Sequence, residues 1–146
     1  MDRWSPLEER CVLRELSSEL NDLSRQVIGA AIEVHRHLGA GHLEQVYENA
    51  LCVELRLRGI CFERQRSFKM IYKGESVGEG RMDLVVDKRL ILELKAVEQV
   101  VNLFRAQLRS YLRATGIELG LLINFNTPRL VDGVERLVNT RQFQLS

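Results

Sequence analysis

Two short apolar runs flank a polar segment in the middle of the chain. Residues 82–86 and 90–94 are almost wholly apolar, and the segment 87–89 between them reads Asp-Lys-Arg. Apolar runs of this length around a short polar segment predict a β-hairpin. With a loop at 87–89, Asp83 lies directly opposite Glu93, so the hairpin brings together the two charged side chains of the runs.

The predicted hairpin has one charged face and one apolar face, because side chains alternate along a strand. Asp83 and Glu93 share the charged face with Lys95, and Arg81 lies opposite Lys95. That face also holds two apolar residues, and near-continuous apolar runs are typical of strands covered on both sides. The apolar residues are Val85 and Ile91 on the charged face and Met82, Leu84, Val86, Leu90, Leu92 and Leu94 on the other.

The charged face has two open interpretations. Asp83, Glu93 and Lys95 form a cross-strand salt-bridge cluster in the first, an arrangement that is common and nearly neutral in energy. In the second, the two carboxylates bind a divalent cation, which compensates for charge buried within apolar strands. The apolar neighbours favour the metal site without excluding the salt-bridge cluster.

The first sixty residues have helical periodicity. We expect residues 1–20 to form a helical extension, because residues 5–8 (Ser-Pro-Leu-Glu) match a capping box with proline at the first helical position. A second helix begins with a cap at residues 21–22 and ends before Gly39. A third helix spans about residues 43–58 and has an apolar face. The residues expected on that face are Leu43, Val46, Ala50, Leu51 and Leu55.

Strand patterns dominate the rest of the chain. We expect one strand at residues 60–72 before the predicted hairpin, a helix at about 100–114, a buried strand at 120–125 and a short edge strand near 134–138. The order is therefore α-α-β-β-β-α-β, with a possible last strand. This order predicts a single α/β domain over residues 21–146, in which helices flank a central mixed β-sheet.

Composition places the chain among ordinary globular proteins. The 146 residues are 45% apolar and 28% charged, enough for one domain with a hydrophobic core. No apolar run approaches the ~20 residues that span a bilayer, and the acidic N-terminus is unlike a signal peptide. We therefore expect a cytoplasmic protein with no membrane partner. The three cysteines lack CxxC spacing and are expected to be reduced.

The hairpin residues Asp83, Glu93 and Lys95 resemble the signature of the PD-(D/E)XK nuclease superfamily. Other segments are similar to the bacterial GxxExxY family of that superfamily, so the resemblance covers about residues 21–138. Met82 stands where the superfamily name has proline, a position that supplies no ligand. The similar segments are residues 28–36 (Ile-Gly-Ala-Ala-Ile-Glu-Val-His-Arg), 41–48 (Gly-His-Leu-Glu-Gln-Val-Tyr-Glu), 78–83 (Gly-Glu-Gly-Arg-Met-Asp) and 120–125 (Gly-Leu-Leu-Ile-Asn-Phe).

The resemblance implies a restriction-endonuclease-like fold and a metal-dependent active site. Asp83 and Glu93 correspond to the two acids that hold Mg²⁺ or Mn²⁺, and the backbone carbonyl of Leu94 is expected to complete the protein ligands. Lys95 corresponds to the lysine that orients the attacking water and offsets developing negative charge. Glu44 is the best match to a further acid on an early helix, which joins the metal site directly or through water.

Further candidate residues lie on the predicted helix at about 100–114 and at the start of the hairpin. Gln107 and Tyr111 resemble the Q-x3-Y pair of an exonuclease-like branch, and residues four apart share a helix face. They are expected to position the catalytic lysine or the substrate. Arg81, Arg105 and Arg109 are candidate phosphate contacts, although solvated or ion-paired side chains explain such arginines as well.

We therefore expect a metal-dependent nuclease that hydrolyses phosphodiester bonds of nucleic acid, with DNA favoured over RNA. One alternative is a catalytically silent nucleic-acid-binding or protein-interaction module on the same fold, in which removal of Lys95 leaves binding unchanged. Another is an oligomerisation module that acts through the helix expected in residues 1–20. Deletion of residues 1–20 would then change the assembly state.

Overall fold

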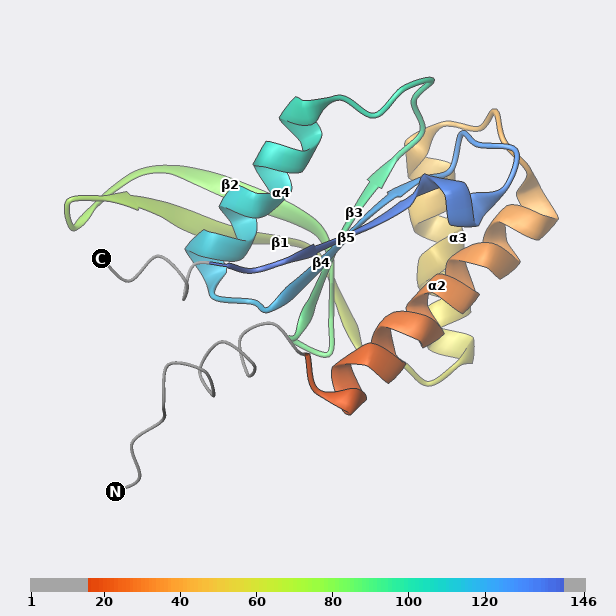
Figure 1. Ribbon diagram of the computed structural model, residues 1–146, viewed down its shortest axis with the longest axis horizontal. Helices are drawn as coiled ribbons and strands as arrows, with labels where there is room; N and C mark the ends of the chain where they lie inside the picture. Colours follow the sequence, from red (N-terminus) through yellow and green to blue (C-terminus); the bar gives the residue numbers. More distant parts are fainter. Residues whose placement is uncertain (1–15, 141–146) are drawn as a thin grey trace.

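The computed structural model describes residues 16–140, so the helical extension expected in residues 1–20 lies mostly outside the described part (Figure 1). The predicted order of elements is confirmed, including the last strand. The elements are α2 (Ser18–Leu38), α3 (Glu44–Leu57), β1 (Phe62–Tyr72), β2 (Glu75–Val86), β3 (Leu90–Lys95), α4 (Asn102–Thr115), β4 (Leu119–Asn124), the 3-10 helix η1 (Leu130–Gly133) and β5 (Val134–Val138).

The five strands form one mixed sheet in the order β1-β2-β3-β4-β5. Neighbouring strands are antiparallel except β3 and β4, which run parallel. A parallel connection needs a crossover, and α4 supplies it between these two strands. Lys95 and Asn124 consequently lie side by side, where β3 and β4 both end.

Helices cover both faces of the sheet. The helices α2 and α3 pack on one face, and α4 crosses the other (Figure 1). The larger apolar cluster lies under α2 and α3 and includes Val27, Leu51 and Leu92. The smaller one lies under α4 and includes Ile91 and Leu108. None of the helices described within residues 16–140 is long and apolar enough to cross a membrane.

The central hairpin has the register expected from the sequence. Strand β2 ends at Val86 and β3 begins at Leu90, so residues 87–89 form the loop. Its first two residues adopt φ values of 50° and 57°. Because Leu84 pairs with Leu92, this register places Asp83 opposite Glu93.

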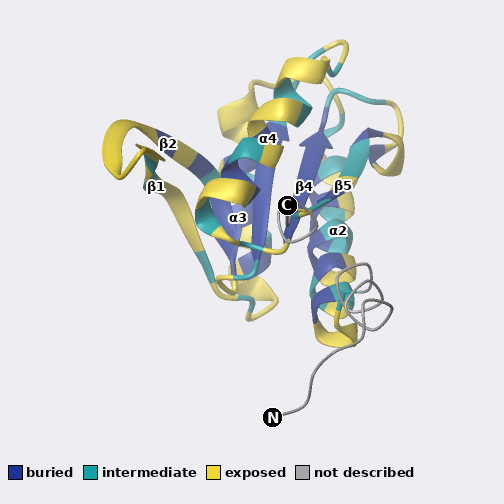
Figure 2. Ribbon diagram, turned by 60° about the vertical axis from the view of Figure 1, so that its left-hand side comes forward, coloured by how far each residue is buried: buried dark blue, intermediate teal, exposed yellow. Residues whose placement is uncertain are grey.

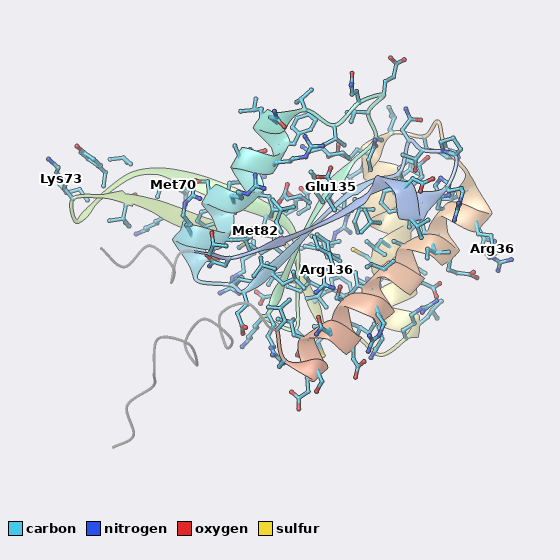
Figure 3. The ribbon with its side chains drawn as sticks, viewed as in Figure 1. Arg36, Met70, Lys73, Met82, Glu135 and Arg136 are labelled. Carbon is cyan, nitrogen blue, oxygen red and sulfur yellow. The ribbon has the colours of Figure 1, made fainter. Side chains whose placement is uncertain are left out.

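The side-chain alternation of β2 breaks at Asp83, which corrects the prediction that Met82 shares a face with Leu84. Leu84 packs under α2 and α3, whereas Met82 packs in the cluster under α4 (Figure 3). The neighbouring strand β1 changes face at the same level, since Phe62 packs in the first cluster and Phe68 in the second. In both strands, the side chains therefore change from one face of the sheet to the other at a level where the sequence pattern predicts regular alternation.

The helix α3 also differs from its prediction, because only part of its expected apolar face is buried. Leu51 and Leu55 are fully buried, but Leu43 and Val46 are 78% and 39% exposed. Glu48 takes a buried position on the helix instead. The helix is thus rotated about its axis relative to the expected face, and a carboxylate points toward the sheet.

The helix α2 begins earlier than the cap expected at residues 21–22. It starts at Ser18, and the Ser17 hydroxyl accepts a hydrogen bond from the backbone N–H of Leu20 at 3.2 Å. Serine is a favoured N-cap because its oxygen satisfies an otherwise unpaired N–H. Leu20 is fully buried, so this first turn packs with the domain.

The outer part of the β1–β2 ribbon projects from the domain (Figure 1). Its tip turns at Lys73 and Gly74, and most residues around the turn are exposed (Figure 2). Strand β3 pairs with β2 only from Leu84 onward, so the outer ribbon has two strands. The change of face at Asp83 marks the boundary between this ribbon and the main sheet.

Candidate functional site

Asp83 and Glu93 lie at the point where β2 and β3 separate. The backbone N–H of Asp83 donates to Glu93 Oε1 at 3.2 Å, and the backbone N–H of Leu94 donates to Asp83 Oδ2 at 2.9 Å. Each carboxylate therefore accepts a hydrogen bond from the opposite strand. These side-chain bonds replace the backbone ladder beyond the Leu84–Leu92 pair and hold the two carboxyl groups next to each other.

The two carboxyl groups disfavour each other's ionisation. Burial and the neighbouring Asp83 raise the pKa of Glu93 to about 8. Burial also raises the pKa of Asp83, although the hydrogen bond from Leu94 opposes this shift. Two adjacent buried anions are unstable unless a cation compensates for them. The pair therefore suits a site that gains a positive ion.

Lys95 supplies one positive charge beside this pair. Its ammonium group lowers the pKa values of Glu44, Asp83 and Glu93, so it faces all three carboxyl groups. The Nζ atom lies 4.4 Å from the centroid of the Phe104 ring, a cation–π distance that holds the side chain in place. When all four groups are ionised, three negative charges face one positive charge.

A divalent cation fits this excess of negative charge. Mg²⁺ binds through one or two carboxylates and keeps several waters. Within residues 16–140, no three His, Cys, Asp or Glu side chains are gathered closely enough to hold a metal ion by themselves. The central hairpin brings together the Asp83–Glu93 pair, and Glu44 lies near enough to interact electrostatically with both carboxyl groups.

A turn before α3 positions Glu44. Gly41 adopts φ = 102°, a conformation that favours glycine. The Tyr47 hydroxyl donates to the Gly39 carbonyl at 2.6 Å and accepts from the backbone N–H of His42 at 3.2 Å. Glu44 then starts the helix; its side chain is exposed, but partial desolvation raises its pKa, and the nearby Asp83 carboxylate raises it further. Glycine and tyrosine thus fix the turn that carries the glutamate.

Gln107 and Tyr111 meet on α4 as expected from their spacing. Gln107 Nε2 donates to the Tyr111 hydroxyl at 3.0 Å. The same hydroxyl interacts with the backbone N–H of Arg81. Burial is the main cause that raises the pKa of Tyr111, and the nearby Glu93 carboxylate raises this pKa further. The Tyr111 ring also packs edge-on against the Phe68 ring, and the two ring centroids are 5.0 Å apart. The helix α4 is therefore joined to β2 beside the acidic pair.

A group around Glu48 was missed by the sequence analysis. Glu48 is only 4% exposed and forms an ion pair with Arg64, whose Nη2 lies 2.8 Å from Oε2. Gln65 Nε2 donates to the other carboxylate oxygen at 2.9 Å. Glu48 acts electrostatically on Asp83 and Glu44. The spacing of Glu44 and Glu48 places both residues on one helix face, but it does not predict that Glu48 is buried.

The three candidate arginines differ in their surroundings. Arg81 lies on β2, two residues before Asp83, and is exposed. Arg105 is bound to Glu135 by two hydrogen bonds of 2.7 and 2.9 Å. Arg109 is exposed on the same helix and acts on Glu135 at longer range. Of the three, Arg81 is the arginine beside the acidic pair.

Fold and site together define an α/β protein with two acids and a lysine at the end of a mixed sheet. A family model described as the PD-(D/E)XK nuclease superfamily matches residues 21–137. The chain therefore belongs to the PD-(D/E)XK nuclease superfamily, whose members are mostly nucleases that generally use divalent metals.

The comparison with solved structures agrees on the fold. A structure titled "Crystal structure of SSO0001" superposes with a TM-score of 0.50 at 15% sequence identity. The match covers 86% of this chain and 79% of that chain. No curated protein sequence matches this chain.

Proposed function

We propose that this protein is a Mg²⁺- or Mn²⁺-dependent nuclease that hydrolyses phosphodiester bonds, with DNA as its substrate. The observation that supports this most strongly is the Asp83–Glu93 pair, in which each carboxylate is held by the opposite strand beside Lys95. We also propose that the chain is a member of the GxxExxY family, since Gly41, Glu44 and Tyr47 form one turn next to this pair.

The proposed ligands are Asp83, Glu93 and the backbone carbonyl of Leu94, with Glu44 joining them directly or through water. When bound, the divalent ion neutralises charge on the phosphate and lowers the pKa of a bound water. The carboxylates are fixed before substrate arrives, because backbone N–H groups hold one oxygen of each. The remaining oxygens can then face the cation with little reorganisation.

Lys95 has the catalytic role next to this pair. Its ammonium orients the attacking water and stabilises negative charge that develops on the phosphate. The Phe104 ring keeps the ammonium close to the acids. Gln107 and Tyr111 hold the Arg81 backbone and so position the segment that leads into Asp83. Arg81 on β2 is the main proposed phosphate contact. Arg105 and Arg109, on α4, are the further proposed contacts.

The test is cleavage of single- and double-stranded DNA and RNA with Mg²⁺ or Mn²⁺. We expect Asp83→Asn and Lys95→Met to lower the rate at least about 1,000-fold, because each removes charge needed in the transition state. The matched controls are Asp87→Asn in the exposed hairpin loop and Lys69→Met on the exposed ribbon. Equal rates for the wild type and both site variants would contradict the proposal, and faster cleavage of RNA would correct the substrate.

A further inference from the structure

Gln65 lies on β1 at the level where the side chains of β1 and β2 change from one face of the sheet to the other. It lies opposite Asp83, between the Arg64–Leu84 and Arg66–Met82 pairs. Its backbone has φ = 49°, a left-handed conformation that is uncommon for residues other than glycine. A glutamine in this conformation inside a strand needs contacts that hold it there.

The Gln65 side chain links two carboxylates from different elements. Its Nε2 donates to Glu48 Oε1 on α3 at 2.9 Å, and the same amide, opposite Asp83 in the strand register, lowers the pKa of that carboxyl group. A primary amide has two N–H donors and no charge, so it can hold two anions without neutralising either. Gln65 therefore connects Asp83 with the buried Glu48.

Glu48 is a fixed anchor for this link. Arg64 binds its other oxygen through Nη2 at 2.8 Å and Nε at 3.2 Å, and Nη2 also donates to Asn49 Oδ1 at 2.7 Å. Both oxygens of Glu48 thus accept hydrogen bonds from side chains of β1. A buried, fully bonded carboxylate can hold the Gln65 amide in one orientation.

We propose that Gln65 is a positioning residue that fixes the Asp83 carboxylate for metal binding. The Leu94 N–H binds one oxygen of Asp83, and the Gln65 amide on the neighbouring strand restricts the carboxylate further, so that Asp83 is held ready for the ion next to Glu93. This inference rests on the proposed metal-dependent function and adds a residue that acts through Asp83. Partners that orient a ligand in this way change metal affinity by about 10- to 100-fold when they are removed.

Binding of Mn²⁺ alone, measured by calorimetry on the full-length protein, tests this role apart from catalysis. Gln65→Gly removes the amide, and glycine accepts the left-handed backbone without strain. Gln65→Asn keeps an amide and also tolerates this backbone, but its side chain is one methylene shorter. Gln26→Ala, on the exposed surface of α2, is the matched control, and Asp83→Ala removes the ligand itself.

We expect Mn²⁺ affinity to fall about 10- to 100-fold in Gln65→Gly, to fall less in Gln65→Asn, and to stay unchanged in Gln26→Ala. Circular dichroism shows whether each variant is folded, and Gln65→Asn serves if Gln65→Gly is not. If the wild type binds Mn²⁺ through Asp83 and both Gln65 variants match its affinity, the positioning role is wrong while the proposed function stands. If the wild type and Asp83→Ala bind Mn²⁺ equally weakly, both proposals are wrong.

Discussion

Glu48 and Glu93 are two buried glutamates with opposite surroundings. Glu48 is 4% exposed and Glu93 is 6% exposed, so water compensates for neither charge. Glu48 is bonded to Arg64 and Gln65, which complete its coordination within the protein. Glu93 lies next to another carboxylate, and its pKa rises to about 8. Burial alone therefore does not mark a functional acid, whereas burial with incomplete charge compensation does.

Substitution of the two glutamates by glutamine should separate their roles. We expect Glu93→Gln to lower cleavage about 1,000-fold, because a neutral amide cannot hold the divalent ion that offsets phosphate charge. Glu48→Gln should retain most activity, since it can still accept a hydrogen bond from Gln65. Rates measured at saturating Mg²⁺ check this, with Glu118→Gln on the exposed surface as a control. Similar losses in both site variants would remove the distinction between the two acids.

Removal of the Glu48 side chain should act mainly on stability. Glu48→Ala removes the ion-pair partner of Arg64 and leaves it only the hydrogen bond to Asn49, and breaking a buried ion pair costs several kcal/mol. Because 37% of the Arg64 side chain is exposed and can be rehydrated, we expect the free energy of unfolding to fall by about 3 kcal/mol.

Urea denaturation measures this change. The matched control is Glu54→Ala, which breaks the Glu54–Arg58 pair on the same helix. A helical pair of this kind contributes about 0.5 kcal/mol. A loss for Glu48→Ala as small as that of the control would show that Glu48 is not a structural anchor.

The two glutamates also show how far the sequence predicts this molecule. The central hairpin follows from local pattern, because loop length and apolar runs fix the register that sets Asp83 opposite Glu93. The burial of Glu48 does not follow from local pattern. Its partner Arg64 lies on another element, and no helical period predicts a buried charge. The change of face at Met82 lies at the same level as the left-handed backbone of Gln65 on the neighbouring strand, and a regular alternating pattern predicts neither of them.

The pKa of Glu93 predicts a pH-dependent stability without metal. The folded protein keeps a proton on Glu93 up to about pH 8, whereas the unfolded chain releases it near the ordinary value of 4.5. The folded state therefore binds more protons in this window, and the free energy of unfolding falls as pH rises from 5 to 8. We expect a fall on the order of 3 kcal/mol.

Urea titrations in EDTA at several pH values measure this fall. Glu93→Gln should flatten the curve, because the amide does not titrate. Mg²⁺ added at pH 8 should raise the stability of the wild type by mass action. A wild-type curve as flat as that of Glu93→Gln would contradict this prediction. It would show that the charges of Asp83 and Glu93 are already compensated within the protein, as the charge of Glu48 is.

The smallest expected effect concerns Tyr111, which lies beside Glu93 but binds neither metal nor buried charge. Tyr111→Phe removes the hydroxyl that joins Gln107 to the Arg81 backbone, while the ring can still pack against Phe68. We expect kcat to fall about tenfold, or ~1.4 kcal/mol, with little change in stability. Tyr72→Phe, at the exposed ribbon tip, is the control. Because the hydroxyl and the amide act as one unit, Gln107→Ala should add little to Tyr111→Phe, and losses that multiply would show that the two side chains act separately.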